Sequence, residues 1–379
     1  MVIYHLFHYL TEGKHYAYEN SLFRATVAGL FCFLVVLLSG PAVIRVLLRF
    51  KIGDRPEFDR ADLNELMKSK ANVPTMGGIL IIGAMIAAAL LFADLTNFYV
   101  VMGLVTLLWL GVLGGVDDAL KIRAARRGER RRDGLRTAEK LLFQLGLGVV
   151  LGTFIFRYGG ENHAISAVSG AMPSYRILDV PFYKPGIALG VVSFMLITVL
   201  VMTASSNAVN LTDGLDGLAA GCAALCTVVF LALTFIVGTE SAARRLLLPH
   251  VPLSLELVVL LGAMLGALLG FLWHNCHQAT VFMGDTGSLP LGGLLGYVAV
   301  VTRQELMLFI AGGVFVIEAL SVILQVSYFK MTGGKRIFAC SPLHHHFQMR
   351  GWTEPKTVVR FWLIAALCGG AALATIKLR

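Results

Sequence analysis

The stretch LVTLLWLGVLGGVDDALK occupies Leu104–Lys121 and decides the class of fold. It begins as an uninterrupted apolar run and ends with two adjacent carboxylates, Asp117 and Asp118, shortly before Lys121. Carboxylates are costly inside a bilayer and much less so at its edge, so a membrane helix that carries two of them there is expected to use them. A helix through this stretch places Asp117 and Lys121 four residues apart on one face. Paired carboxylates repel each other, and a bound divalent cation would relieve that repulsion.

The overall composition indicates a membrane protein. Of the 379 residues, 57% are hydrophobic and only 15% are charged, and the mean hydropathy is +0.75. Ordinary soluble domains carry roughly 25% charged residues, so this composition excludes a soluble globular protein. The net charge of +9 lies largely in loops between apolar runs, which indicates membrane orientation and gives no reason to expect nucleic acid as a partner. The six cysteines show no compact pairing pattern and are expected to be free thiols.

Hydropathy predicts ten membrane spans, most of them close to the ~20 residues that cross ~30 Å of hydrocarbon. The predicted spans are 22–48, 75–93, 98–119, 138–157, 185–204, 217–237, 255–273, 287–302, 306–329 and 357–376. We therefore predict an all-α polytopic membrane protein with ten transmembrane helices. It is expected to form a single domain over residues 1–379, with residues 1–20 as a short N-terminal interfacial segment.

The distribution of lysine and arginine predicts the orientation of these spans. Loops after the odd-numbered spans hold nineteen such residues, with six in 49–70, eight in 121–136 and five in 330–356. The opposite side, including both termini, holds ten. Because basic residues accumulate in short cytoplasmic loops, the loops after odd-numbered spans are predicted to be cytoplasmic and both termini to be periplasmic.

Five polar motifs fall on the predicted cytoplasmic side, and the outer loops contain nothing comparable. The motifs are KSKANVPTMGG (68–78), DDALK (117–121), NAVNLTDGLDG (207–217), HNCHQATVFMGDTGS (274–288) and SPLHHHFQMRGW (341–352). A transporter more often places its polar residues near the middle of the membrane, at broken helices. A cluster confined to one face predicts chemistry on that face, with a cleft that opens to the cytoplasm.

Two of these motifs are rich in acidic residues. Asp117 and Asp118 either bind a cation or act as a base, or they form a solvated helix end with a salt bridge to Lys121. Because carboxylates near a helix C-terminus oppose the macrodipole, they are not there as caps. In NAVNLTDGLDG, Asp213 and Asp216 share a helix face, and helix capping explains only one of the four Asn and Asp residues.

The motif before the eighth span combines a carboxylate with an aromatic ring. Asp285 is placed to ligate a cation that faces the aspartate pair, and the amides that start this helix are expected to hold phosphate oxygens. Phe282 either stacks on a planar base or packs at the membrane interface. The histidines and Cys276 do not match the spacings of structural zinc sites, so we expect the histidines at 344–346 to contact phosphate or a base.

Together, hard oxygen ligands, amide-rich helix starts and basic loops describe a magnesium-assisted phosphate site. Such a site is expected to be reached by both a soluble phosphorylated donor and a lipid phosphate of the inner leaflet. Two polar residues inside span nine also need partners. Gln325 is expected to face the site and Glu318 to mark a kink or helix contact, with helix-to-helix hydrogen bonding as the alternative.

Several of these stretches resemble one known family. NLTDGLDGLA, FMGDTGSLPLGG, GGKRIF and PLHHHF followed by GW are similar to the phospho-N-acetylmuramoyl-pentapeptide transferase family, from about Lys70 to the tenth span. The DD and DGLDG elements are shared with the wider polyprenyl-phosphate N-acetylhexosamine-1-phosphate transferase superfamily, and the triple histidine is the more specific signature. The chain departs from the family at Asn72 and Val73, at Gln348, and in the basic stretch RAARRGERRRDG (123–134).

The resemblance implies a Mg²⁺-dependent enzyme of peptidoglycan synthesis in the bacterial inner membrane, acting on its cytoplasmic side among membrane lipids as a homodimer. Undecaprenyl phosphate attacks the β-phosphate of UDP-N-acetylmuramoyl-pentapeptide (UDP-MurNAc-pentapeptide), giving lipid I and UMP. It implies Asp117 as the base, Asp118 in support and Asp285 as the direct Mg²⁺ ligand, with all three as candidate metal residues and His344 as a further catalytic residue. The positions that match substrate-binding residues are Lys70, Thr75, Lys121, Lys140, Asn210, Asp213, Gly214, Leu215, Asp216, Asn275, Phe282 and His345.

Two alternatives stay open at this point. A sibling enzyme that moves N-acetylglucosamine-1-phosphate onto the same lipid would differ in the histidine loop, which reads HHHF here. A magnesium or solute transporter would place acidic residues at mid-membrane depth, whereas these lie at one interface. Direct attack by the lipid phosphate is favoured over a phospho-enzyme intermediate, because one deprotonating carboxylate suffices.

Overall fold

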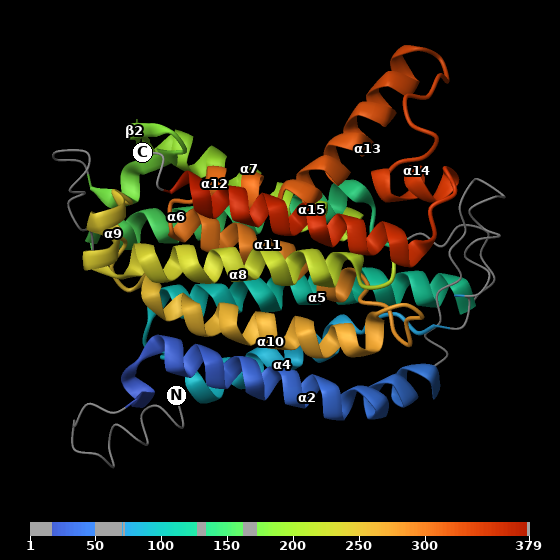
Figure 1. Cartoon of the computed structure of the whole chain (residues 1–379), viewed down its shortest axis with the longest axis horizontal. Helices are drawn as coiled ribbons and strands as arrows, with labels where there is room; N and C mark the ends of the chain where they lie inside the picture. The colour runs from blue at the N-terminus through green and yellow to red at the C-terminus, as the bar shows by residue number, and fades with distance from the viewer. Residues whose placement is uncertain (1–16, 50–69, 71–72, 127–133, 162–172, 377–379) are drawn as a thin grey trace.

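The protein is a bundle of long helices that run roughly side by side (Figure 1). The computed structural model describes residues 17–49, 70, 73–126, 134–161 and 173–376. The N-terminal segment before residue 17 and most of the basic stretch at 123–134 lie outside the described residues. The long helices are α2 (Ser21–Arg49), α4 (Gly78–Phe92), α5 (Phe98–Arg126), α6 (Thr137–Glu161), α7 (Val191–Thr212), α8 (Leu218–Gly238), α10 (Leu257–Asn275), α11 (Asp285–Val301), α13 (Gly313–Met331) and α15 (Glu354–Thr375).

Short elements connect these helices. They are the single turns Ala17–Glu19, Ser174–Arg176 and Ser254–Glu256, the helices α9 (Glu240–Leu246), α12 (Glu305–Ala311) and α14 (Leu343–Met349), and the strands β1 (Ile177–Val180) and β2 (Tyr183–Ala188). The two strands form an antiparallel hairpin in which Ile177 pairs with Ala188 and Val180 with Tyr183.

The prediction of an all-α polytopic membrane protein is confirmed. Each of the ten predicted spans contains a helix, and among the described residues eight helices are long and apolar enough to cross a membrane. The other two, α4 and α11, have 15 and 17 residues. The total of ten spans therefore stays a prediction.

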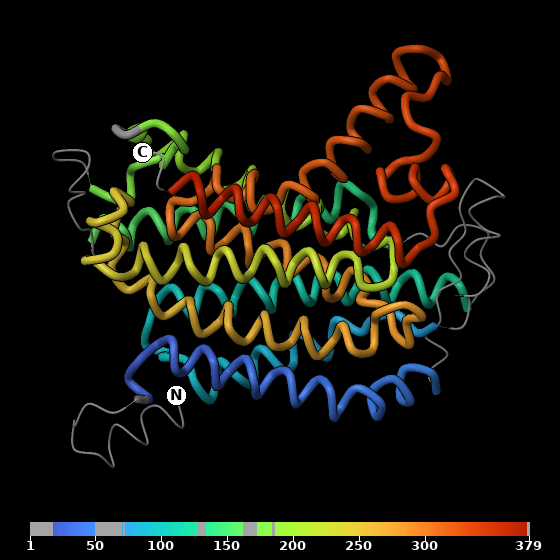
Figure 2. Tube along the Cα trace, in the orientation of Figure 1, coloured from blue at the N-terminus to red at the C-terminus, as the bar shows by residue number. Residues whose placement is uncertain are grey.

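Three predicted boundaries are wrong. The fifth span begins at Val191 and not at 185, because residues 183–188 pair with β1 as a strand. The ninth span is not one helix, since α12 ends at Ala311 and α13 begins after Gly312, leaving the bundle at an angle (Figure 2). Helix α5 runs on to Arg126, so Asp117 and Asp118 lie about two turns before its C-terminus and not at it.

The two most buried helices, α10 and α11, flank the polar motif at 274–288 and fix its position in the bundle. Helix α10 packs against α2, α4 and α8, whereas α11 packs against α5 and α7. At the start of α11 the backbone of Asp285 touches Gly114 of α5 so closely that any side chain at Gly114 would overlap it. This close approach brings the aspartates of α5 beside the first turn of α11.

All five polar motifs, in their described parts, lie at one end of the bundle, the end that carries α14 in Figure 1. Helix α2 begins and α15 ends at the opposite end, near the β-hairpin and α9. The opposite end carries two of the charged residues expected on that side, Arg303 and Glu305, and both are buried. The guanidinium carbon of Arg303 lies 4.6 Å from the centre of the Phe194 ring, and its Nη1 lies 3.6 Å from Glu305 Oε1.

Candidate active site

Two carboxylates and two ammonium groups form the centre of the site, which we call the carboxylate–lysine cluster. Asp117 and Lys121 come from α5, Lys140 from the start of α6, and Asp285 from the start of α11. The Nζ atoms of Lys121 and Lys140 each lie 2.7 Å from Asp117 Oδ2, and they lie 3.3 and 2.6 Å from Asp285 Oδ2. Both ammonium groups keep contact with solvent, because the Lys121 and Lys140 side chains are 40% and 20% exposed.

Asp117 is fixed by the backbone on one side and turned toward the lysines on the other. Its Oδ1 accepts a hydrogen bond from the Leu135 N–H at 2.7 Å, and Gly134 passes so close that a side chain there would overlap the carboxylate. Its Oδ2 accepts no well-directed hydrogen bond, although both ammonium groups are at ion-pair distance. The oxygen that faces the cluster is therefore held by charge, between the two ammonium groups.

Asp118 makes different contacts from Asp117. Its Oδ2 accepts from the Thr286 N–H at 2.9 Å and the Thr286 hydroxyl at 2.6 Å, while Oδ1 accepts from the Asp285 N–H at 3.2 Å. Asp118 thus caps the N-terminus of α11. The expectation that these helix-start amides hold phosphate oxygens is wrong, because the Asp118 carboxylate already occupies them.

The three carboxylates have the composition of a magnesium site. One oxygen each from Asp117, Asp118 and Asp285 lies within 4.8 Å of the other two, and all three residues are buried. Mg²⁺ prefers such hard oxygen ligands. Three carboxylates against two ammonium groups leave a formal charge of −1, so the residues fit an additional cation.

Two predicted residues at the end of α7 extend this cluster. The Asn210 side-chain amide donates to Asp285 Oδ1 at 2.8 Å and contacts the Ser288 hydroxyl at 2.9 Å. Burial, followed by the nearby carboxylates of Asp285 and Asp118, raises the pKa of Asp213 to about 7.

A second group of predicted residues meets beside the first. Lys70 forms ion pairs with Asp216, at 2.6 Å, and with Glu354, and its Nζ lies 5.8 Å from the centre of the Phe282 ring. His277 lies 3.5 Å from Asp216, so this group also contains a set of metal-ligating side chains. Because the Lys70 ammonium group already lies between the Asp216 and Glu354 carboxylates, these residues form an ion-pair network beside the Phe282 ring.

Three further predicted residues support the loops around this ring. Asn275 is buried, and its amide is used within the loops, accepting from Gly217 N–H and donating to the Val281 carbonyl. Thr75 and Leu215 are buried as well. The backbone from Pro74 to Gly78 is hydrogen-bonded to Phe282 and Met283, which joins the first and fourth polar motifs.

The three histidines do not lie on an open loop as expected. They belong to the short helix α14, where His344 and His345 are buried. Glu318 of α13 accepts from both the backbone N–H and the Nδ1 of His344 in α14 at 3.1 Å, so the predicted helix contact through Glu318 is confirmed. The far edge of the His344 ring rests against Gly214, where any side chain would overlap it.

The remaining polar residues of this region also find partners that the sequence did not indicate. His345 bonds Gln348 at 2.8 Å, and burial followed by the neighbouring His344 lowers the pKa of His345 to about 3. Gln325 accepts from the backbone N–H groups of Ile337 and Phe338, so its side-chain oxygen is used within the segment before α14.

Sequence reasoning missed Glu354 and underrated Glu318. A glutamate in the first turn of a helix, as at Glu354 before Pro355, reads as an ordinary helix start. Nothing local in the sequence reveals its contact with Lys70, 284 positions earlier. Of these two residues, only Glu318 is marked by the sequence, because a carboxylate within an apolar run requires a partner.

The fold and the site define a polytopic all-α membrane protein with a buried carboxylate–lysine cluster suited to phosphate chemistry, and comparison with known proteins agrees. The family description "Glycosyl transferase family 4" matches residues 98–303. Three phospho-N-acetylmuramoyl-pentapeptide-transferases are similar over almost the whole chain. Those of Desulfotalea psychrophila and Desulfatibacillum aliphaticivorans are each 41% identical, covering 99% and 100% of this chain and 100% and 97% of their own, and that of Thermodesulfovibrio yellowstonii is 39% identical, covering 100% and 99%.

The chain belongs to the phospho-N-acetylmuramoyl-pentapeptide-transferase family. The resemblance noted from the sequence motifs is confirmed.

Proposed function

We propose that this protein transfers phospho-N-acetylmuramoyl-pentapeptide from UDP-MurNAc-pentapeptide to undecaprenyl phosphate, which yields lipid I and UMP. The observation that carries the proposal is the convergence at one end of the bundle of two polar groups. The carboxylate–lysine cluster suits a pair of phosphates, and the Lys70–Asp216–Phe282 group suits a nucleoside. The relatives' shared name supplies the particular donor.

In the proposed reaction an oxygen of the lipid phosphate attacks the β-phosphorus of the donor. The bond between the β-phosphorus and the oxygen shared with the α-phosphate breaks, and UMP leaves with the bonding electrons. Lys121 and Lys140 are placed to hold the incoming phosphate by charge and to stabilise the negative charge that moves across the two phosphates. Their partial exposure leaves them accessible to a ligand.

Asp117 is the proposed base. Its Oδ2 lies at ion-pair distance from the two ammonium groups that are proposed to hold the lipid phosphate, so it is placed beside the phosphate whose last proton it takes. A phosphate monoester loses that proton near pH 6, so the step demands little of the base. Asp118 acts through Asp285, whose place it fixes by capping α11.

Asp117 and Asp285 are the residues proposed to hold Mg²⁺, with Asp118 adjoining them. When bound, the ion would supply Lewis-acid stabilisation of the charge on the transferred phosphoryl group. Asn210 steadies Asp285 from the opposite side.

The nucleoside is proposed to bind at the Phe282 ring, within reach of Lys70, Asp216 and the Gly214–Leu215 backbone. Glu354 keeps the Lys70 ammonium beside that ring. His344 is held by Glu318 against Gly214, so it shapes this loop and acts on the donor through it.

Localisation, orientation and assembly complete the proposal. We expect a protein of the bacterial inner membrane with ten spans, both termini in the periplasm and the active site open to the cytoplasm, as the lysine and arginine counts predict. We also expect a homodimer and a role in cell-wall synthesis, and thereby in cell shape and division.

A donor comparison tests the proposal. Purified protein with undecaprenyl phosphate and Mg²⁺ is incubated with UDP-MurNAc-pentapeptide or with UDP-N-acetylglucosamine, and UMP is measured. We expect UMP only with the first donor. Release only with UDP-N-acetylglucosamine would assign the chain to the sibling activity, and release with neither donor would contradict the proposal.

A further inference from the structure

Gln144 is a buried polar residue that the proposed reaction does not use. It belongs to α6, is 3% exposed, and follows Lys140 by one helical turn on the same face. Its side-chain amide donates to the Ser206 hydroxyl at 3.2 Å and accepts from the Asn207 amide at 2.7 Å. The Ser206 hydroxyl in turn donates to the Leu289 carbonyl at 3.0 Å. Gln144 therefore links α6, through α7, to α11.

These contacts, which we call the Gln144 layer, lie one turn deeper in the bundle than the carboxylate–lysine cluster. In the cluster, Lys140 of α6 lies 2.6 Å from Asp285 of α11, and Asn210 of α7 donates to the same carboxylate at 2.8 Å. In the Gln144 layer each of these helices contributes a residue four positions away, which is about one helical turn. The two layers therefore join the same three helices.

The contact between α6 and α7 continues deeper in the bundle through glycines. Gly148 lies so close to Val199 that a side chain there would overlap the Val199 backbone, and Gly152 packs against Met195. Small residues of this kind let two helices approach closely. Such packing changes gradually when one helix shifts, whereas hydrogen bonds accept only a narrow range of distances and angles. The Gln144 layer therefore constrains the position of α6 more tightly than the glycine contacts do.

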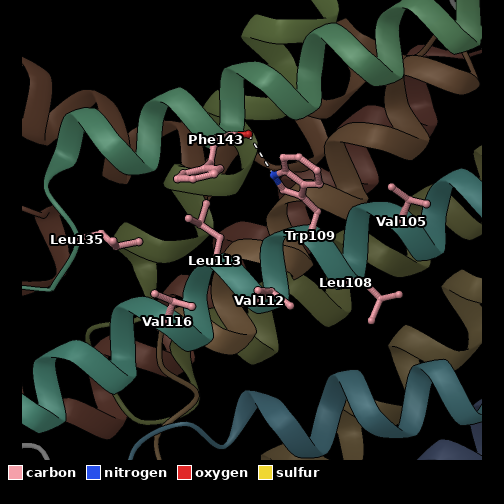
Figure 3. Close-up of a pocket in the computed structure, with 8 residues that line it drawn as sticks. All are labelled: Val105, Leu108, Trp109, Val112, Leu113, Val116, Leu135 and Phe143. Atoms are coloured by element: carbon pink, nitrogen blue, oxygen red, sulfur yellow. Dashed lines mark hydrogen bonds between the residues drawn. The ribbon is translucent and has the colours of Figure 1, made fainter.

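The opposite side of α6 gives Lys140 less support. There α6 faces α5 across an apolar pocket of about 610 Å³ (Figure 3). The Trp109 indole N–H spans the gap and donates to the Phe143 carbonyl at 3.1 Å, but the other residues that line the pocket are apolar. Helix α6 packs chiefly against α7, so the contacts with α7 have the larger part in fixing the position of Lys140.

We infer that Gln144 is a positioning residue for the transfer reaction, because it holds α6 where the Lys140 ammonium group lies between Asp117 and Asp285. The inference rests on the proposed function, which gives Lys140 the task of holding the acceptor phosphate. Among the described residues the hydrogen bonds of Gln144 go to α7, outside the carboxylate–lysine cluster, so it acts through the helix that carries Lys140. Catalytic groups need to be held to within about 0.5 Å, and a misplacement of about 1 Å costs roughly 10²-fold in rate.

Steady-state kinetics of Gln144→Leu test the inference. Leucine keeps an apolar side chain of similar size in the interface and removes both hydrogen bonds. We expect the KM for undecaprenyl phosphate to rise at least fivefold and kcat to fall at least tenfold. The KM for UDP-MurNAc-pentapeptide should stay within a factor of about two, because the Lys70–Asp216–Phe282 group contains no residue of α6. A merely structural defect would lower kcat alone, through loss of active enzyme, and both KM values at the wild-type level would overturn the inference.

Thr227→Val is the matched control. Thr227 is a fully buried polar residue of α8, and within the described part of the chain its hydroxyl bonds only the Ala223 carbonyl of the same helix. This variant also loses a buried hydrogen bond, but not one that joins two helices. Its kinetic constants are expected to stay within a factor of about two of the wild type. Losses as large as those of Gln144→Leu would mean that any missing buried hydrogen bond has this effect, and Gln144 would have no positioning role.

A double-mutant cycle tests the route through Lys140. In the Lys140→Gln background, Gln144→Leu is expected to change the remaining kcat/KM for undecaprenyl phosphate by less than about twofold, since the residue that Gln144 positions is already absent. If the two effects multiply instead, Gln144 acts independently of Lys140 and the inference is wrong.

Hydrogen exchange of the amides at 137–146 gives a readout that does not need turnover. It is expected to be at least tenfold faster in Gln144→Leu and to stay at the wild-type rate in Thr227→Val. This result without UMP release from any donor by the wild type would contradict the proposed function and leave the positioning of α6 by Gln144 in place. Unchanged exchange in Gln144→Leu, with UMP release by the wild type, would contradict the positioning role alone.

Discussion

At Asp117 a fully buried carboxylate is held by one backbone N–H and shared between two ammonium groups. Replacing it by asparagine keeps an oxygen for the Leu135 N–H and removes the charge and the base. We expect Asp117→Asn to fold and to lose about 10²–10⁴-fold in kcat, the usual contribution of a general base. Steady-state UMP release measures this loss.

Glu139→Gln is the control for that substitution. Glu139 is a carboxylate at the same end of the molecule, next to Lys140 in sequence, but among the described residues its side chain bonds only the Arg136 backbone N–H. Its variant is expected to retain activity within a factor of about two. An Asp117→Asn enzyme as active as Glu139→Gln would remove Asp117 from the mechanism.

The two adjacent aspartates show the limit of reading single residues from the sequence. The sequence presents them as equivalent, and it correctly places both next to Asp285. Successive positions on a helix point in directions about 100° apart, so Asp117 faces α6 and Asp118 faces the start of α11. Only the packing of α5 on α11 assigns the capping task to Asp118, and no local pattern encodes that packing.

His345 provides a pH dependence of stability. Its pKa is lowered to about 3 by burial and by His344, whereas an exposed histidine titrates near 6.5. Between these values the unfolded chain binds a proton that the folded chain does not bind. The stabilising contribution is therefore present above about pH 6.5 and is lost as the pH falls toward 3.

The size of this effect follows from the same linkage. At pH 5 the loss for one such histidine is about 2 kcal/mol relative to neutral pH. Thermal unfolding of the wild type and of His345→Gln at pH 7 and pH 5 measures it, and other titrating groups cancel in the comparison. We expect the wild type to lose more stability on acidification, and parallel losses in the two proteins would contradict the assignment.

At the scale of elements, Glu318 holds α14 against α13. It accepts two hydrogen bonds from His344, and hydrogen bonds to charged groups are each worth about 1.5–3 kcal/mol. Glu318→Ala should therefore speed the hydrogen exchange of the amides at 343–349 by at least tenfold. Mass spectrometry of the exchanged peptides measures this rate.

Ser321→Ala is the control, since Ser321 lies one turn away on the same helix and, within the part of the chain that the structure describes, its hydroxyl bonds only the Glu318 carbonyl. This variant should exchange at the wild-type rate over 343–349. If Glu318→Ala also exchanged at that rate, the tether between α13 and α14 would be refuted.

The elements themselves were largely predictable, because long apolar runs have few alternatives in a membrane. The exceptions have physical causes. Residues 185–188 continue directly into the apolar run of the fifth predicted span, and only pairing with Ile177–Val180 makes them part of a strand. The break at Gly312 was not foreseen, since glycine is common within membrane helices and gives no distinct sign of a helix end.

At the scale of the whole molecule, the sequence correctly gathered the polar motifs at one end, because alternating spans return every second loop to the same side. It could not show that the site divides into a carboxylate–lysine cluster and a nucleoside group joined through residues 210–216. Nor did it reveal the buried Arg303 and Glu305 at the other end, since two charges in a short loop look solvated until the fold encloses them.

The fate of the donor's β-phosphate tests the central claim most directly. Protein, undecaprenyl phosphate, Mg²⁺ and UDP-MurNAc-pentapeptide radiolabelled in the β-phosphate are incubated, and the label is followed into the lipid and aqueous products. Transfer of a phospho-sugar predicts that all transferred label enters the lipid and that the nucleotide product is unlabelled UMP. Label that remains in released UDP, with an unlabelled sugar on the lipid, would contradict the account.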